Sequence, residues 1–187
     1  MIYFTSDTHF CHIKEFLFTP RGFTNVEDMN SAIIEKWNRT IGPDDEVYHL
    51  GDFVMNDIDA GIELIKQLNG KIHLIRGNHD TDKKVERYLE CPNIVDIKWA
   101  DMIKYKKNYF FLSHFPMVAK TPDDSESKQD VYNLHGHTHQ MQSIATNTFY
   151  NYHVGVDSHD CYPVSIDQIW EEIKAAKGAY YENVQDN

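Results

Sequence analysis

The sequence lacks the long apolar run that a membrane-spanning helix requires. Its apolar residues come in short runs, and none approaches the roughly 20 residues that cross a bilayer. Met1 leads directly into Ile2 to Thr5, without the basic segment and cleavage site of a secretory signal. We therefore expect a protein that stays in the cytoplasm and has no membrane partner.

Cysteine is also scarce. Cys11, Cys91 and Cys161 cannot all pair with one another, and their spacing matches no zinc finger or redox motif. They indicate a reducing compartment, in agreement with a cytoplasmic location.

Positive charge is in short supply as well. The chain has 18 Lys and Arg against 29 Asp and Glu, which gives a net charge of -11, and no basic patch is visible. Because phosphate backbones are held mainly by Lys and Arg, this balance disfavours nucleic acid as a partner. A small phosphorylated substrate remains compatible with it. Nothing in the sequence indicates the oligomeric state.

Neither an internal repeat nor a low-complexity linker interrupts the chain. With 187 residues, of which 41% are hydrophobic, the chain is long enough for one well-buried core and short for two. We expect a single domain over residues 1–177, followed by a loosely held C-terminal tail over residues 178–187.

The first part of the chain alternates strand and helix patterns. β-Branched and aromatic residues predict strands at 2–6, 46–50 and 71–76. Apolar spacing of three and four residues predicts a helix from Asn25 to about Gly42 and another over residues 57–68. This β-α-β-α-β order is typical of a parallel sheet with right-handed crossovers.

The second part has the pattern of a separate sheet. Strands are expected at 102–105 and 109–112, which form a hairpin, at 131–134, and as a pair within 148–156. Ser165 is suited to cap a final helix, and residues 123–130 are polar enough for a solvated loop. The whole pattern predicts an α/β fold, a four-layer α/β/β/α sandwich of two mixed β-sheets flanked by helices.

Side chains that bind metals follow the ends of five predicted strands. Each apolar run is followed, directly or within a few positions, by one of these residues: Asp7, Asp52, Asn78, His114 or His137. A lone Asp there is usually a turn residue, and a lone His usually a satisfied hydrogen-bonding group. Five in one chain are hard to attribute to turns, and ligands gather outside the carboxyl ends of strands in such folds. We therefore expect one shared site, which also includes His9 and His139.

The predicted site has enough oxygen and nitrogen ligands for two metal ions. Two divalent ions about 4 Å apart repel each other by on the order of 20 kcal/mol at an effective dielectric of about 20, so a carboxylate that bridges them is the natural device to hold both. Asp52 is the candidate bridge. One ion would be completed by Asp7, His9 and His139, and the other by Asn78, His114 and His137. This mixed shell suits Mn²⁺, which we expect, or Fe²⁺ or Zn²⁺, better than Ca²⁺ or Mg²⁺.

The motifs also resemble those of a known family. In order and in type, the chain is similar to the calcineurin-like metallophosphoesterase superfamily at Asp7-x-His9, Gly51-Asp52, Gly77-Asn78-His79-Asp80, His114 and Gly136-His137-x-His139. The resemblance covers about residues 1–160, and residues 155–157 and 163–165 make it similar to the small bacterial and phage phosphoesterases. It implies the metallophosphoesterase fold and a dinuclear site in which a metal-bridging hydroxide attacks phosphorus in line. It also implies that His79 protonates the leaving oxygen or stabilises its charge.

One departure from the family pattern narrows the function. In phosphoprotein phosphatases the Gly-Asp motif continues into an Asp-Arg pair, whereas here residues 53–56 read Phe-Val-Met-Asn. A protein phosphatase is therefore disfavoured. Asp80 is a second catalytic candidate because it could orient His79, although it could instead cap a helix over residues 81–89.

The cations that grip phosphate would have to come from elsewhere in the chain. Arg21 and His12 lie on the long loop after the first strand and are the candidate substrate-binding residues, with solvated side chains as the alternative for each. His135, His153 and His159 have no assigned role. Cys11 is expected to be a small packing residue.

The sequence therefore predicts a metal-dependent phosphoric ester hydrolase. We expect a small phosphodiester or phosphomonoester as substrate and favour the diester, because no pair of phosphate-binding arginines is visible. The alternatives are a non-catalytic interaction scaffold on the same fold, as in the retromer subunit, and a nuclease or nucleotide pyrophosphatase. The intact ligand set and the retained His79 favour an enzyme.

Overall fold

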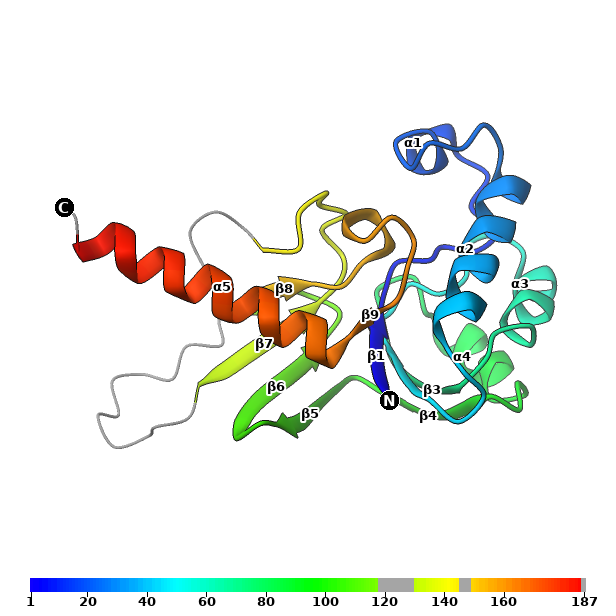
Figure 1. The fold of residues 1–187 in the computed structure, drawn as a ribbon. Helices are drawn as coiled ribbons and strands as arrows, with labels where there is room; N and C mark the ends of the chain where they lie inside the picture. Colours follow the sequence, from blue (N-terminus) through cyan, green and yellow to red (C-terminus); the bar gives the residue numbers. More distant parts are fainter. Residues whose placement is uncertain (118–129, 145–148, 186–187) are drawn as a thin grey trace.

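Two mixed sheets form the framework of the protein (Figure 1). The computed structural model describes residues 1–117, 130–144 and 149–185. Its strands are β1 (Ile2–Thr5), β2 (Glu46–His49), β3 (Lys71–Ile75), β4 (Ile94–Lys98), β5 (Ala100–Tyr105), β6 (Asn108–Ser113), β7 (Val131–His135), β8 (Asn151–His153) and β9 (Val164–Ser165). The order is β4-β3-β2-β1-β9 in the five-stranded sheet and β5-β6-β7-β8 in the four-stranded sheet.

Helices lie against both sheets. They are α1 (Glu15–Phe18), α2 (Val26–Thr40), α3 (Ile58–Ile65), α4 (Asp82–Tyr88) and α5 (Ile166–Gln185), with a short 3₁₀ helix at Val156–Ser158. Figure 1 shows α2, α3 and α4 on one side of the five-stranded sheet and α5 running across β7 and β8. This arrangement confirms the predicted α/β fold class of two mixed sheets with flanking helices.

The predicted helix starts have the expected caps. The Asn25 side chain accepts a hydrogen bond from the Asp28 amide at the start of α2, and Asp57 accepts one from Ala60 at the start of α3. Ser165 accepts one from the Gln168 amide at the start of α5. These local bonds fix where each helix begins.

The strand order brings the functional loops together. β1, β2, β3 and β4 pair in parallel, so their carboxyl ends lie at one edge of the sheet. The parallel pairs β6-β7 and β7-β8 do the same in the second sheet. β4 and the two-residue β9, which runs antiparallel to β1, extend the first sheet beyond what the sequence pattern predicts.

Two apolar clusters hold these layers. In the first, Met29, Ile33 and Trp37 of α2 pack with Val47 and Ile72 of the five-stranded sheet. Since successive residues of a strand point to opposite faces, Phe4 of β1 joins the second cluster instead, where its partners include Phe110, Tyr132, Ile169 and Ile173. The second cluster therefore joins both sheets to α5.

One expectation needs correction, and the expectation of a loosely held tail stays a prediction. Within residues 148–156 the structure has the single strand β8 in place of a strand pair, with residue 148 outside the described part. α5 continues to Gln185, so residues 178–185 of the expected tail are helical. The rings of Tyr180 and Tyr181 lie 5.5 and 6.0 Å from Phe149, which explains why this turn of helix is held. The expected loop at 123–130 lies outside the described residues except for Asp130.

Among the described residues, no helix has both the length and the apolar character needed to cross a membrane.

Candidate metal centre

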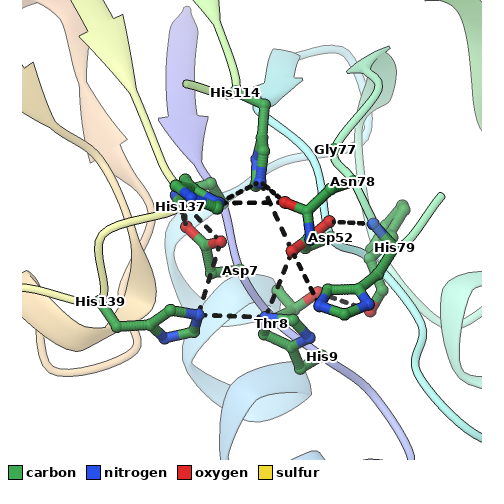
Figure 2. A network of polar contacts seen from close by, with 12 residues as sticks. Asp7, Thr8, His9, Asp52, Gly77, Asn78, His79, His114, His137 and His139 are labelled. Carbon is green, nitrogen blue, oxygen red and sulfur yellow. Dashed lines mark hydrogen bonds and ion pairs between the residues drawn. The ribbon is translucent and has the colours of Figure 1, made fainter. Parts of the chain in front are cut away.

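The structure brings all seven predicted metal ligands together (Figure 2). They come from the loops that follow five strands: Asp7 and His9 after β1, Asp52 after β2, Asn78 after β3, His114 after β6, and His137 and His139 after β7. Figure 2 shows these side chains pointing toward one another. Residues separated by more than a hundred positions thus share one site.

The backbone of this site is strained. Five of the predicted ligands lie in the left-handed region, with φ of 57° at Asp7, 47° at His9, 58° at Asp52, 68° at His137 and 47° at His139. A non-glycine residue in this region costs on the order of 1–3 kcal/mol and persists only where the surroundings enforce it. Such concentration at one place is typical of a functional site.

Two motif glycines let the backbone approach the carboxylates. A Cβ on Gly77 would lie 2.1 Å from Oδ1 of Asp52, and one on Gly136 would lie 2.5 Å from Oδ2 of Asp7. Backbone amides approach the carboxylates there. The His79 N–H donates to Asp52 over 2.9 Å, and the His137 N–H donates to Asp7 over 3.0 Å. Each glycine is therefore required by the carboxylate it faces.

The first set of donors is formed by Asp7, His9 and His139. Nε2 of His9 lies 3.2 Å from Nε2 of His139, which lies 3.8 Å from Oδ1 of Asp7. The ligand atoms of all three residues lie within 4.8 Å of one another, as a shared ion requires.

The second set is formed by Asn78, His114 and His137. The side-chain oxygen of Asn78 lies 2.9 Å from Nε2 of His114 and 3.0 Å from Nδ1 of His137, and these two nitrogens are 3.2 Å apart. Nδ1 of His114 lies 2.8 Å from the carbonyl oxygen of Leu50 and donates to it. With its proton on Nδ1, the neutral imidazole of His114 presents the lone pair of Nε2 towards Asn78.

The two carboxylates lie between these sets. Oδ2 of Asp52 is 3.6 Å from Nε2 of His9 and 3.5 Å from Nε2 of His114. Asp7 also serves both sides, because its ligand atom lies within 4.8 Å of those of His9 and His139 and of those of Asp52 and His114. The sequence suggested Asp52 alone as the bridge, whereas the geometry puts both carboxylates in a position to bridge.

The two buried carboxylates of the site need positive charge close to them. Asp7 is fully buried, and this raises its pKa to about 6 against the opposing effect of His139 and His114. For Asp52, burial also acts to raise the pKa, but the hydrogen bond and charge of His114 outweigh it and hold the pKa below its ordinary value. Burial lowers the pKa of His9 to about 2, so that imidazole is neutral and able to coordinate.

The donor set fits divalent metal ions. Imidazole nitrogens, an amide oxygen and carboxylate oxygens converge within 2.9 to 3.8 Å. So many metal-binding atoms this close together favour a bound cation. Mixed nitrogen and oxygen ligands suit Mn²⁺, Fe²⁺ or Zn²⁺.

Asp157 supports the first set, and sequence reasoning assigned it no role. Its Oδ2 accepts a hydrogen bond from Nδ1 of His139 over 2.9 Å, and both of its oxygens receive the guanidinium of Arg21. Burial opposes protonation of His139, but Asp157 and Asp7 raise its pKa above the ordinary value. In the sequence, residues 155–157 belong only to the family resemblance, because a three-residue 3₁₀ helix is too short to give a periodic signal.

Arg21 lies beside the site but faces inward. Only 2% of its side chain is exposed, and Nη2 also donates to the backbone carbonyl of Asp7 over 2.8 Å. These contacts favour a role in holding the Asp7 loop over the expected grip on a phosphate.

The two candidate catalytic residues differ in their surroundings. The His79 side chain is 40% exposed, and its Nε2 lies 4.0 Å from Oδ2 of Asp52. The Asp80 carboxylate is buried and accepts hydrogen bonds from the amides of Asp52, Phe53 and Gly77 and from the Tyr88 hydroxyl. Asp80 thus joins the loops after β2 and β3. It does not cap α4, whose N-cap residue is Thr81.

His12 is close to the first set. Its ring is edge-on to His9 with centroids 5.7 Å apart, and its Nδ1 accepts a hydrogen bond from the Lys14 amide. The residue is 5% exposed. A direct role in substrate binding stays a prediction.

Comparison with known proteins identifies the family. A model of the calcineurin-like phosphoesterase superfamily domain matches residues 1–155. The chain belongs to this superfamily. The family supports a metal-dependent phosphoesterase as the general function and divalent metal ions as cofactors.

Three similar proteins extend over nearly the whole chain. An uncharacterized protein of Methanocaldococcus jannaschii is 34% identical over 184 residues, which cover 94% of this chain and 93% of that protein. The gene 66 protein of Mycobacterium phage D29 is 28% identical, with coverage of 92% and 95%. The crystal structure of a protein of unknown function from Aquifex aeolicus has a TM-score of 0.68 at 28% identity, with coverage of 91% and 98%. The similarity therefore extends over nearly the full length of this chain and of each of the three proteins.

Proposed function

We propose that this protein hydrolyses a small phosphodiester at a dinuclear site of divalent transition-metal ions, with Mn²⁺ as the expected metal. The observation that carries the proposal is the meeting of two sets of lone-pair donors at the buried carboxylates Asp7 and Asp52. When bound, the two ions would supply the activated water that attacks phosphorus in line and would hold the phosphate oxygens.

The carboxylates set the charge of the site. Asp7 and Asp52 neutralise two of the four positive charges that a pair of dications brings, so the site keeps a net attraction for phosphate. The chain as a whole has a net charge of -11, so anions are repelled elsewhere on its surface. Binding of a small anion is thereby directed to the metal centre.

His79 is the proposed general acid. Its ring is partly exposed at the edge of the donor cluster, 4.0 Å from Asp52. Its backbone is held at both ends, because its N–H donates to Asp52 and its carbonyl oxygen accepts from the Lys84 ammonium. These contacts support a role in which His79 delivers a proton to the leaving oxygen. Asp80 supports the same loop through the amides it binds.

The preference for a diester rests on charge. A monoester has a second negative charge, which exposed arginines commonly hold in phosphatases. Within the described part of the chain, Arg21 is the guanidinium that contacts the donor set, and it is buried and paired with Asp157. A singly charged diester needs no further cation.

Metal content and turnover on one sample test this proposal. We expect about two ions per chain after free Mn²⁺ is removed, and faster hydrolysis of bis-p-nitrophenyl phosphate than of p-nitrophenyl phosphate. Asp52→Asn keeps the side-chain shape and the acceptor for the His79 amide, so the protein stays folded. The loss of charge is expected to lower turnover by about a thousandfold.

Asp96→Asn is the matched control, because Asp96 pairs with His73 and Lys98 away from the donor cluster. This variant is expected to keep wild-type turnover. A folded, metal-loaded wild-type protein that is inert towards both esters would contradict the proposal and favour the scaffold alternative.

A further inference from the structure

Large apolar side chains are exposed on three loops that supply the predicted ligands. They are Ile13 and Phe16 after β1, Phe115 and Met117 after β6, and Met141 after β7. Exposed apolar side chains close to a functional site can contribute to its ligand-binding surface. Ligand pockets also combine apolar walls with a few polar groups that fix orientation, which here are the metal ligands.

Phe115 lies in direct ring contact with two of the donors. Its ring centroid lies 4.6 Å from that of His137 and 5.1 Å from that of His114. The side chain is nevertheless 48% exposed. Part of an aromatic ring is therefore open to solvent beside the second donor set.

Phe16 is one residue further from the first donor set, behind His12. Its ring lies 5.4 Å from His12, whose ring lies 5.7 Å from His9. The neighbouring residues Leu17 and Phe18 of α1 are buried and anchor the helix, whereas Phe16 is 73% exposed. An exposed phenyl ring thus contacts the second donor set directly, and another reaches the first set through His12.

Aromatic rings stack on the planar faces of nucleobases without reading their sequence. The net charge of -11 disfavours a long polyanion as substrate. Together with the exposed aromatic rings, it favours a single nucleoside over a nucleic-acid strand. We propose that Phe115, assisted by Phe16, stacks on the base of a nucleoside phosphodiester and determines specificity for it over alkyl phosphodiesters. This inference rests on the proposed phosphodiesterase function.

Two diesters with one leaving group test the proposal. Thymidine 5′-(p-nitrophenyl phosphate) and methyl p-nitrophenyl phosphate both release p-nitrophenolate, so the ratio of their kcat/KM values isolates the contribution of the nucleoside. We expect Phe115→Ala to lower this ratio about tenfold and Phe16→Ala to lower it less, while Phe115→Tyr keeps it. Leu89→Ala removes an apolar side chain that is also exposed, on the turn after α4, and is expected to leave the ratio within about twofold of wild type.

A binding measurement separates this inference from the proposed function. Calorimetric titration of the Mn²⁺-loaded protein with thymidine 5′-monophosphate and with inorganic phosphate gives a ratio of Kd values that needs no turnover. We expect Phe115→Ala to reduce the preference for the nucleotide about tenfold. A wild-type protein that cleaves neither ester would defeat the proposed function, and the binding ratio would still decide the role of Phe115.

Two outcomes would overturn the inference. One is an unchanged binding ratio in both alanine variants. The other is an equal loss towards both esters together with loss of bound Mn²⁺ in Phe115→Ala, which would show that the ring only supports His137.

Discussion

Asp157 accepts a hydrogen bond from Nδ1 of His139 over 2.9 Å, on the side of the imidazole that faces away from the donor cluster. With its proton on Nδ1, the neutral imidazole presents the lone pair of Nε2, which lies 3.2 Å from Nε2 of His9. Carboxylates that bind the second nitrogen of a metal-ligating histidine fix the tautomer and orient the ring. Asp157 therefore acts on the metal centre without being one of its predicted ligands.

Asp157→Asn is expected to weaken Mn²⁺ binding by about 10- to 100-fold. Asparagine can still accept from His139 through its amide oxygen, but it loses the negative charge and the second acceptor that Arg21 uses. Competition titration with a fluorescent chelator measures the change. Asp160→Asn is the control, because Asp160 is three residues further on, its side chain is 82% exposed, and it pairs with Lys36 on the surface. Equal Mn²⁺ affinity in the two variants would refute the supporting role.

His79→Ala is expected to depend on the leaving group. A general acid contributes typically about 10²- to 10⁴-fold, and it matters most where the leaving oxygen is strongly basic. We therefore expect a loss of at least about a hundredfold for an alkyl leaving group and a smaller loss for p-nitrophenolate. Rates for a series of aryl and alkyl diesters, measured at saturating Mn²⁺, give the slope against leaving-group pKa. An equal loss for every leaving group would show that His79 does not protonate the leaving oxygen.

The sequence correctly predicted the elements that contribute the site, since apolar runs and caps such as Asn25 are local signals. β9 escaped prediction because two residues are too short for any period, and its place is set by pairing with Tyr3 and Phe4. Asp157 escaped for a related reason, because its partners Arg21 and His139 are far away in the chain. Motif residues were found by type and order, whereas supporting residues are defined by contacts alone.

The sequence predicted that Arg21 lies near the site, but not which way its side chain faces. The sequence put it near the site as a phosphate-binding residue, and only the fold reveals that its guanidinium is buried against Asp157. Composition and spacing cannot distinguish a cation that faces substrate from one that faces the interior.

Arg21→Gln is expected to destabilise the protein by about 3 kcal/mol, because it leaves the Asp157 carboxylate buried without its charged partner. Urea denaturation measures the free energy of unfolding. Arg39→Gln removes an exposed helical pair with Glu35 and is expected to cost less than about 0.5 kcal/mol. A variant of Arg21 with wild-type stability but a raised KM would instead restore the role of gripping phosphate.

Gly178→Ala tests how far α5 is folded in solution. Gly178 is inside the helix, and a Cβ there would meet no atom within 4 Å. Alanine in an exposed helix position is better than glycine by about 0.5–1 kcal/mol, so we expect a Tm higher by about 2 °C. Gly70→Ala is the opposite case, because its φ is +90° and a Cβ would lie 2.7 Å from Cγ2 of Ile41, so this change lowers Tm. If residues 178–187 formed a loose tail, the substitution at Gly178 would leave Tm unchanged, since neither folded nor unfolded chain would gain helix there.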